Sequence, residues 1–372
     1  MPFGYLITTG VMLAYVLFAV APPRPRRSSP WRVSFWLGYL VNELPFLAFP
    51  VLAASTAVAI AQGDIATPVG WIGLGLAIVA TAGLVVIVRR ALRTGEVVDR
   101  ALAEAGLPPR PGRRLPWARI LLWPFAFPHT GIERISNIAY GDGGRGNLLD
   151  VYRHRSHPGG GPTLIHLHGG AFRIGNKSRE ARPLFYRLAG RGWVCISANY
   201  RLRTPFPDPL VDLKKVIAWV REHGPEYGAD PGLVFVAGSS AGGYLASMAA
   251  LTANDPSLQP GFEAADTSVT AVVSLYGYYG STGPGRTSPM AYDGQGAPPF
   301  FVVHPDRDAL VVVDDARRLV DHLRETSPNP VVYAELPGAQ HAFDFFYSIR
   351  FSAVIDGIEA FADCSLRARP RS

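Results

Sequence analysis

Residues 233–243 read LVFVAGSSAGG and join a short apolar run to an alanine-rich one. The β-branched and aromatic residues of the first part predict a strand, and the residues from Ala241 onward predict a helix. G-x-S-x-G between a strand and a helix is typical of a nucleophile elbow, a sharp turn that lifts its central serine above a sheet. The helix N-terminus behind the turn favours developing negative charge. We therefore predict that Ser240 is a catalytic nucleophile and that its neighbour Ser239 is structural.

On both sides of this motif, short β-branched runs alternate with helical stretches. The predicted strands cover residues 132–140, 148–154, 163–168, 193–198, 233–237, 270–276, 300–304 and 331–336. The predicted helices cover residues 178–191, 209–227, 241–253, 313–325 and 343–362. Strands separated by helices imply a mostly parallel sheet. The first two strands have no helix between them, so we expect an antiparallel edge on an α/β sheet of about eight strands.

The third predicted strand ends in LHGGAF, residues 167–172. Attack on an ester carbon creates an oxyanion, which needs preorganised N–H donors. A glycine pair frees backbone amides to point at one spot, so we predict that the donors are among Gly169, Gly170 and Ala171, joined by the amide of Ala241. His168 is expected to shape this loop rather than to act as a base.

A general base and an orienting acid should follow the last strands of the sheet. Of the nine histidines, His341 is the one that follows the last predicted strand and precedes the final helix. The segment after the seventh strand, HPDRDALVVV, offers two carboxylates. Asp308 is favoured because it directly precedes the apolar ALV segment, whereas Asp306 has the position of a turn residue after Pro305.

Three long apolar runs occupy the N-terminal third, at residues 4–21, 35–61 and 69–88. A hydrocarbon core of ~30 Å needs about 20 apolar residues in a helix, and each run can supply them. We therefore predict three transmembrane helices within residues 1–90. The middle run is interrupted around Glu43, so we expect its spanning part to begin near Leu44. Glu43 is expected to be interfacial or paired within the bundle, with a functional intramembrane acid as the alternative.

The net charge of +7 lies entirely in this N-terminal third, where residues 1–135 hold 13 arginines and 6 acids. The excess flanks apolar runs instead of gathering on a folded basic domain, which favours a membrane surface over nucleic acid as partner. Arginines follow the first run and end the third: Arg24, Arg26, Arg27 and Arg32, then Arg89, Arg90 and Arg93. The positive-inside rule therefore places the catalytic part in the cytoplasm and the N-terminus outside. Since the charges follow the first run, we expect an uncleaved span rather than a signal peptide.

Residues 91–130 connect the last apolar run to the catalytic domain, which we assign to residues 131–372. The connection contains the basic stretch PPRPGRR and then the aromatic stretch WARILLWPFAFP. Its aromatic residues lie beside arginines: Trp117, Trp123, Phe125 and Phe127 with Arg113, Arg114 and Arg119. Two interpretations stay open, a segment that lies on the membrane or a cap that packs on the catalytic domain as part of a lid.

These motifs together resemble one branch of a known family. HGGAF, NYRLRTPFPDPLVDLKKVIAWV, GSSAGG and the Ser–Asp–His order resemble the hormone-sensitive-lipase-like α/β-hydrolases. EYGADPGLVFVAGSSAGG followed by LTANDPSLQPGFEAADTSV is similar to the membrane-associated esterases and lipases of actinobacteria. The resemblance covers residues 131–365 and implies an α/β-hydrolase fold and carboxylester hydrolysis without a metal or an organic cofactor. The chain departs from the family pattern at Pro305, usually glycine, at Val312, usually proline, and in a shortened YRLRTPFP signature.

The sequence therefore predicts a membrane-anchored serine carboxylesterase or lipase that cleaves small-molecule or lipid esters through an acyl-enzyme. One alternative is another acyl hydrolase on the same fold, such as an arylformamidase or a feruloyl or acetyl esterase, because the triad does not name the leaving group. The other alternative is a catalytically idle membrane-bound binding module. The acyl chain length, the alcohol and the oligomeric state are left open.

Overall fold

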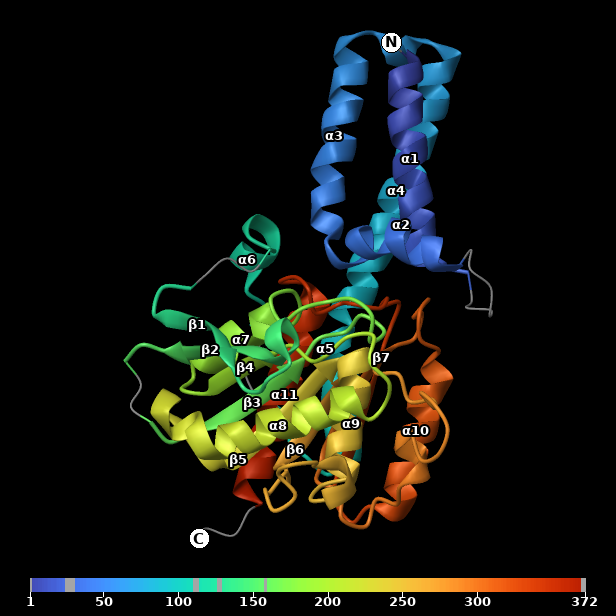
Figure 1. The fold of residues 1–372 in the computed structure, drawn as a ribbon. Coiled ribbons are helices and arrows are strands. Elements are labelled where there is room, and N and C mark those ends of the chain that lie inside the picture. Colours follow the sequence, from blue (N-terminus) through green and yellow to red (C-terminus); the bar gives the residue numbers. More distant parts are fainter. Residues whose placement is uncertain (1, 24–30, 110–113, 126–128, 157–158, 369–372) are drawn as a thin grey trace.

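The computed structural model describes residues 2–23, 31–109, 114–125, 129–156 and 159–368. An N-terminal helical bundle stands on an α/β unit that contains the rest of the chain (Figure 1). Several residues named in the sequence predictions lie outside the described residues: Arg24, Arg26, Arg27, Arg113 and Phe127.

The bundle consists of three upright helices and one that lies across their base (Figure 1). The upright helices are α1 (Pro2–Val20), α3 (Pro45–Ala61) and α4 (Pro68–Leu92), and the fourth is α2 (Trp31–Glu43). α2 and α3 meet at an angle of 87°. Pro45 explains this bend, because proline is favoured in the first turn of a helix and disfavours helical geometry in the residue before it. By length and composition, α1 and the helical stretch that begins with α4 could each cross a membrane, and the bent pair α2–α3 is a third candidate.

Small residues let the upright helices approach one another closely. A Cβ added at Gly83 of α4 would lie 2.3 Å from Val16 of α1, and one added at Gly73 would lie 2.8 Å from the ring of Tyr5. Close contact at small residues is the usual way in which membrane helices associate, because lipid tails supply no hydrophobic driving force between helices. Gly73 and Gly83 therefore allow the close contact between α4 and α1.

The α/β unit is built on one eight-stranded sheet in the order β1-β2-β4-β3-β5-β6-β7-β8. Its strands are β1 (Ile132–Ala139), β2 (Leu148–His154), β3 (Gly161–Leu167), β4 (Val194–Ala198), β5 (Ala229–Ser239), β6 (Ala271–Leu275), β7 (Phe300–Pro305) and β8 (Val331–Leu336). β2 is antiparallel to both of its neighbours, and all the other pairs are parallel. The predicted mostly parallel sheet with an antiparallel edge is confirmed.

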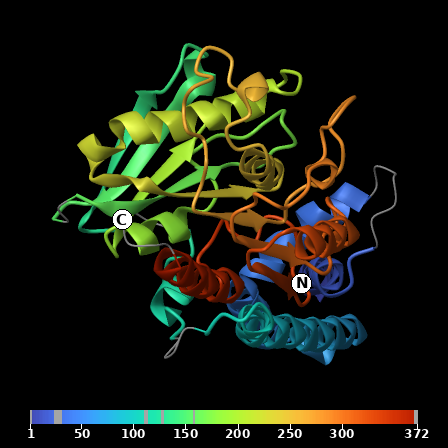
Figure 2. The same ribbon diagram turned by 90° about the horizontal axis from the view of Figure 1, so that it is seen from below.

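Helices cover both faces of this sheet. One apolar core lies under α8 (Asp208–His223), α9 (Ala241–Leu251) and α10 (Val313–Thr326), and the other lies under α5 (Thr94–Glu104), α7 (Arg182–Ala189) and α11 (Ile349–Arg367). Figure 2 shows α8 in yellow-green and α11 in red on opposite sides of the strands. α5 directly follows the bundle and packs so closely on α11 that a Cβ at Gly357 would lie 2.3 Å from Val98. Part of the predicted connection thus belongs to the α/β core.

The last helix begins later than the sequence pattern predicts. α11 starts at Ile349, after Ser348, whose side chain accepts a 3.1 Å hydrogen bond from the amide of Phe351. Residues 341–348 form turns instead of the expected helical start, and they carry His341 and Asp344 into the interior. The short helix α6 (Trp117–Leu122) lies near the base of the bundle (Figure 1).

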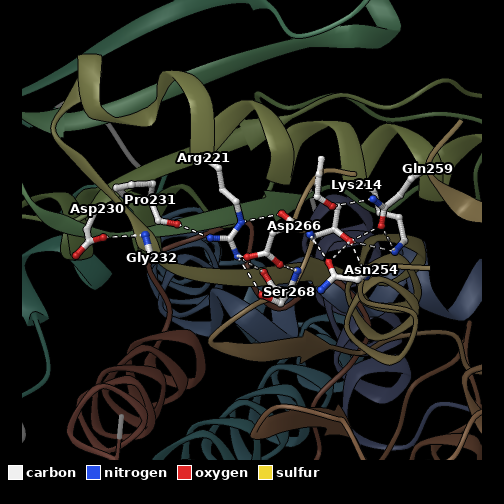
Figure 3. A network of polar contacts seen from close by, with 11 residues as sticks. Lys214, Arg221, Asp230, Pro231, Gly232, Asn254, Gln259, Asp266 and Ser268 are labelled. Carbon is white, nitrogen blue, oxygen red and sulfur yellow. Dashed lines mark hydrogen bonds and ion pairs between the residues drawn. The ribbon is translucent and has the colours of Figure 1, made fainter. Parts of the chain in front are cut away.

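A polar network holds the segment between α9 and β6 against α8 (Figure 3). Lys214 of α8 is buried and donates to Gln259 at 3.5 Å and to Thr267 at 3.3 Å. Burial lowers the pKa of Lys214 to about 8. Arg221 donates to the carbonyl oxygens of Asp266 and Pro231, each at 2.7 Å. Pro231 lies near the start of β5, whereas Ser240 follows the last residue of that strand. The network therefore stabilises a part of the scaffold that is distant from the nucleophile.

Candidate active site

Ser240 lies in the sharp turn between β5 and α9. Its backbone has φ 55° and ψ −113°, a conformation that costs a non-glycine residue free energy and persists only where its surroundings enforce it. The amide of Ser240 donates to the carbonyl oxygen of Leu275 at 2.9 Å. A Cβ at Gly238 would lie 2.1 Å from the oxygen of Gly242, and one at Gly242 would lie 2.0 Å from the oxygen of Leu167. The glycines of the motif are therefore required by close backbone contacts.

His341 and Asp308 are joined by a hydrogen bond of 2.6 Å between Nδ1 and Oδ2. The other carboxylate oxygen of Asp308 accepts from the amides of Leu310 and Val311, each at 2.8 Å. Burial alone would raise the pKa of Asp308, but the charge and hydrogen bond of His341 and the nearby imidazole of His304 outweigh it, so the pKa lies below its usual range. Asp308 is thus suited to remain ionised and to orient the imidazole.

The nucleophile and the imidazole share a neighbour at the end of β6. Leu275 accepts the amide hydrogen of Ser240, and the ring of the next residue, Tyr276, lies 4.5 Å from that of His341. Among the described residues, Ser240 Oγ and His341 make no direct hydrogen bond. Such bonds are often long in a free enzyme and shorten when substrate binds. The three predicted triad residues therefore come from loops that follow β5, β7 and β8 at one end of the sheet.

Asp306, the alternative acid, has a different hydrogen-bond partner from that of Asp308. Its Oδ1 accepts a 2.7 Å hydrogen bond from the amide of Gly338, at the start of the loop that leads to His341. Burial raises the pKa of Asp306, and this hydrogen bond opposes the rise. Asp306 lies in the turn after β7, and this hydrogen bond joins that turn to the loop that leads to His341.

The loop after β3, which carries three of the predicted oxyanion donors, has an unusual backbone. Gly170, Ala171 and Phe172 have φ of 118°, 52° and 60° in succession. A Cβ at Gly170 would lie 1.8 Å from the oxygen of Ile174, so this position requires glycine. His168 donates from Nδ1 to the oxygen of Gly169 at 2.6 Å, in accord with its predicted part in shaping the loop.

One predicted oxyanion donor is contradicted by the structure. The amide of Gly169 already donates to Oε2 of Glu180 at 2.5 Å, so it is not available to a substrate oxygen. The amides of Gly170, Ala171 and Ala241 donate no hydrogen bond to any residue that the structure describes. The prediction is therefore wrong for Gly169, and the other three amides stay as candidates.

A buried acidic network lies behind Ser240, and the sequence analysis did not predict it. Asp344 accepts from Ser239 Oγ at 2.6 Å and also from the hydroxyl of Tyr276. His166 donates to Ser239 Oγ at 3.0 Å. Burial and the nearby charge of Asp344 raise the pKa of Glu180 well above its usual range. Asp344 follows His341 by three residues and could have been noticed, whereas Glu180 lies in a polar stretch with no recognisable pattern.

Two histidines of this region should make stability depend on pH. Burial lowers the pKa of His166 to about 3 and that of His168 to about 4. In the unfolded chain both titrate near pH 6.5, so below that value the unfolded state binds protons that the folded state cannot bind until about pH 4. The free energy of unfolding should therefore fall on acidification, by about 2 kcal/mol per histidine between pH 7 and pH 5.

This prediction can be checked by thermal unfolding of the full chain in detergent at pH 7, 6 and 5. His166→Gln keeps an N–H donor for Ser239 and removes the titration, so its loss of Tm on acidification should be smaller than that of the wild type. An equal loss in both proteins would contradict the assignment.

Comparison with known proteins identifies the family. The sequence profile of the BD-FAE family matches residues 149–282. The probable carboxylic ester hydrolase LipM of Mycobacterium tuberculosis is 37% identical over 407 residues, which cover 96% of this chain and 92% of that protein. The chain belongs to the esterase and lipase family of α/β-hydrolases. Another esterase of this family from the same organism, LipQ, is 41% identical over 61% of each chain.

Solved structures agree with this esterase fold. An esterase from the Planctomycetes species Thermogutta terrifontis superposes with a TM-score of 0.53 and 24% sequence identity, covering 62% of this chain and 90% of that one. The predicted resemblance to the hormone-sensitive-lipase-like branch and the α/β-hydrolase fold are confirmed. The chain is an ester-cleaving hydrolase by family membership.

Proposed function

We propose that this chain is a membrane-anchored serine carboxylesterase in which Ser240, His341 and Asp308 form the catalytic triad. The observation that carries the proposal is the conjunction of a strained serine at the N-terminus of α9 with a buried His341–Asp308 hydrogen bond of 2.6 Å. A strained nucleophile and a base held by an ionised acid are the parts that acyl transfer to a serine requires.

The reaction follows from these positions. Ser240 Oγ attacks the ester carbonyl carbon while His341 Nε2 accepts the hydroxyl proton, because Nδ1 is held by Asp308. The carbonyl oxygen becomes an oxyanion that receives hydrogen bonds from the amides of Gly170, Ala171 and Ala241. Collapse of the tetrahedral intermediate breaks the bond to the alcohol oxygen, and His341 returns the proton to it.

Water then completes the cycle. It attacks the acyl carbon while His341 takes one of its protons, and collapse of the second intermediate releases the carboxylic acid and restores Ser240. No step of this scheme calls for a metal ion or an organic cofactor. In this scheme, backbone amides and the N-terminus of α9 stabilise the negative charge that develops on the carbonyl oxygen.

A cavity of about 660 Å³ adjoins the oxyanion loop at Ala171. Phe172, Phe206 and Tyr244 supply aromatic walls, and the side chain of Arg203 lies at the same cavity. Arg173, Thr204 and Thr282 also line the cavity, so aromatic and polar groups both face it. Such a mixed lining suits an organic ester that carries polar groups of its own. We assign this cavity to the part of the substrate nearest the reacting carbonyl.

The anchor is proposed to be residues 1–90, with the catalytic domain in residues 131–372 on the cytoplasmic side. In support, the apolar upright helices α1, α3 and α4 leave many large side chains exposed, such as Ile7, Ile60 and Ile78. The alignment with LipM covers 96% of this chain, so it includes much of this N-terminal region. Side chains of this kind on a helical surface are stable in lipid and unfavourable in water.

Topology gives a prediction of its own. Reporter fusions at residue 29 and at the C-terminus should both report the cytoplasm, and a fusion between α3 and α4 should report the outside, because the arginines flank the cytoplasmic ends. Alkaline phosphatase activity measured against green fluorescence distinguishes the two sides. A periplasmic or external C-terminus would overturn the proposed orientation.

The activity itself is tested with the purified full chain in detergent. We expect it to hydrolyse p-nitrophenyl butyrate, and a parallel panel of an aryl formamide, a feruloyl ester and an acetyl ester distinguishes the related acyl hydrolases. Absence of hydrolysis across the whole panel by a folded preparation would support the idle binding module instead.

A further inference from the structure

A second cavity lies beside α6 and is separate from the candidate triad. It has a volume of about 280 Å³, and its walls come from the segment around α6, from α7 and from α11. Of the described residues that line it, none belongs to the triad. Its charged lining residues are Arg114, Arg119, Arg187, Arg191 and Asp356. The cavity is therefore a separate site in which positive charge predominates.

Two of these arginines are paired with acids. Arg187 contacts Asp356 at 3.2 Å and Glu359 at 3.1 Å, and Arg191 contacts Glu359 at 3.0 Å. Both carboxylates lie on α11 and are buried. Asp356 and Glu359 therefore balance the charges of Arg187 and Arg191.

The other two arginines, Arg114 and Arg119, form no ion pair with any residue that the structure describes. Arg119 donates to Nδ1 of His129 at 3.0 Å, and its guanidinium lies 5.2 Å from the centre of the Tyr347 ring. Burial and the charge of Arg119 lower the pKa of His129 to about 4, so this imidazole is uncharged at neutral pH. Its Nε2 then carries the hydrogen and donates to the hydroxyl of Tyr347 at 2.7 Å. These contacts orient Arg119 without neutralising it, so two positive charges remain unbalanced at the cavity.

The cavity lies at the level of the membrane end of the molecule. The ring of Trp117 in α6 meets that of Phe46 in α3 at 6.0 Å, and Ile120 shares an apolar cluster with Ala91 of α4. Figure 1 shows α6 beside the base of the bundle. The exposed residues of this segment include large apolar ones: Trp117, Leu121, Leu122 and Trp123. Because tryptophan is enriched where membrane meets water, this segment favours the headgroup region.

We propose that this cavity binds the phosphate group of an anionic membrane lipid, held by Arg114 and Arg119. The planar guanidinium group matches the oxygens of a phosphate, and lipid phosphates are the anions found at a membrane surface. Ligand pockets usually have volumes of about 300–1,000 Å³, so this smaller cavity suits a headgroup while the lipid chains stay along the apolar side chains of α6. The inference rests on the proposed membrane location of the bundle and is independent of the serine mechanism.

A lipid that no esterase can cleave tests this binding without turnover. The probe is the dioctyl ether of glycerol phosphate, and the control ligand is the dioctyl ether of glycerol, which has the same chains and no phosphate. Native mass spectrometry of the full chain in a neutral detergent counts the bound molecules and gives Kd. We expect one molecule of the phosphate probe per chain and no specific binding of the control ligand.

Three glutamine variants assign the binding to the cavity. Arg114→Gln and Arg119→Gln should each raise Kd for the probe about fivefold, because each removes one positive charge from the phosphate. Arg114 is exposed and donates no hydrogen bond to a described residue, so its replacement should leave the fold intact. The matched control is Arg93→Gln, at an exposed arginine that ends α4 outside the cavity, and it should keep Kd within about twofold.

Each outcome decides the proposal. An unchanged Kd in both cavity variants overturns it, as does an equal rise in Arg93→Gln, which would indicate general attraction between charges. Equal binding of the phosphate-free ether would show that the chains alone are recognised, and equally tight binding of inorganic phosphate would indicate a site for the free anion instead of a lipid. Hydrolysis of p-nitrophenyl butyrate is measured separately. Its absence, with binding of the probe intact, would refute only the proposed serine mechanism.

Discussion

Replacing Ser240 by alanine is expected to lower kcat for p-nitrophenyl butyrate by about 10⁴-fold or more. The hydroxyl is the atom that forms the acyl-enzyme, so its loss removes the covalent route and leaves only the contribution of the oxyanion hole and of binding. The site itself should survive, because the turn at Ser240 is enforced by backbone contacts of Gly238 and Gly242. The measurement is steady-state hydrolysis by the full chain in detergent, with circular dichroism as the check on folding.

Ser247→Ala is the matched control. Ser247 lies on the same helix α9, is buried, and donates to the carbonyl oxygen of Gly243 at 2.9 Å. Its loss should cost a little stability and leave kcat within about threefold. Substantial ester hydrolysis by Ser240→Ala would contradict the serine mechanism.

Asp308→Asn is expected to lower kcat by about 10²- to 10⁴-fold with little change in the fold. An asparagine at this position cannot supply the negative charge that stabilises the imidazolium, and its amide can hold His341 in the wrong tautomer. The amides of Leu310 and Val311 can still donate to the remaining side-chain oxygen, so the loop should keep its shape. The pH dependence of kcat/KM should change along with the rate, as a purely structural defect would not require.

Asp306→Asn separates the two candidate acids. Asparagine can still accept the hydrogen bond from the amide of Gly338, so this variant should keep kcat within about tenfold of the wild type. If Asp306→Asn suffered the larger loss and Asp308→Asn the smaller one, Asp306 would be the acid of the triad.

Local sequence patterns were sufficient to predict the fold and to choose most residues of the candidate site. The strand–turn–helix context of Ser240 and the alternation of strands and helices are encoded by residues close together in the chain. His341 and Asp308 could be chosen by their places after particular strands, because parallel strands bring their carboxyl ends to one edge of the sheet. Their mutual hydrogen bond agrees with that choice, while the catalytic roles themselves await the variants above.

Contacts between distant segments could not be predicted. The bond from Gly169 to Glu180 removes a donor that the glycine pattern favoured, and nothing in the polar stretch around Glu180 marks it as buried. The helix expected from residue 343 begins only at Ile349, and Asp344 in the preceding turns accepts a hydrogen bond from Ser239, a partner about 100 positions away. The packing of Phe35 on His341 joins residues about 300 positions apart, and the apolar pattern of the first helices indicates only that they favour lipid.

The central claim is that Ser240 is the nucleophile, and covalent labelling tests it most directly. An organophosphate such as paraoxon transfers its phosphoryl group to an activated serine. After the full chain reacts with paraoxon, intact-protein and peptide mass spectrometry should find a single adduct on Ser240, formed in parallel with the loss of esterase activity and absent from Ser240→Ala. An adduct on another residue that accounts for the inactivation, or full inactivation with Ser240 unmodified, would contradict the account.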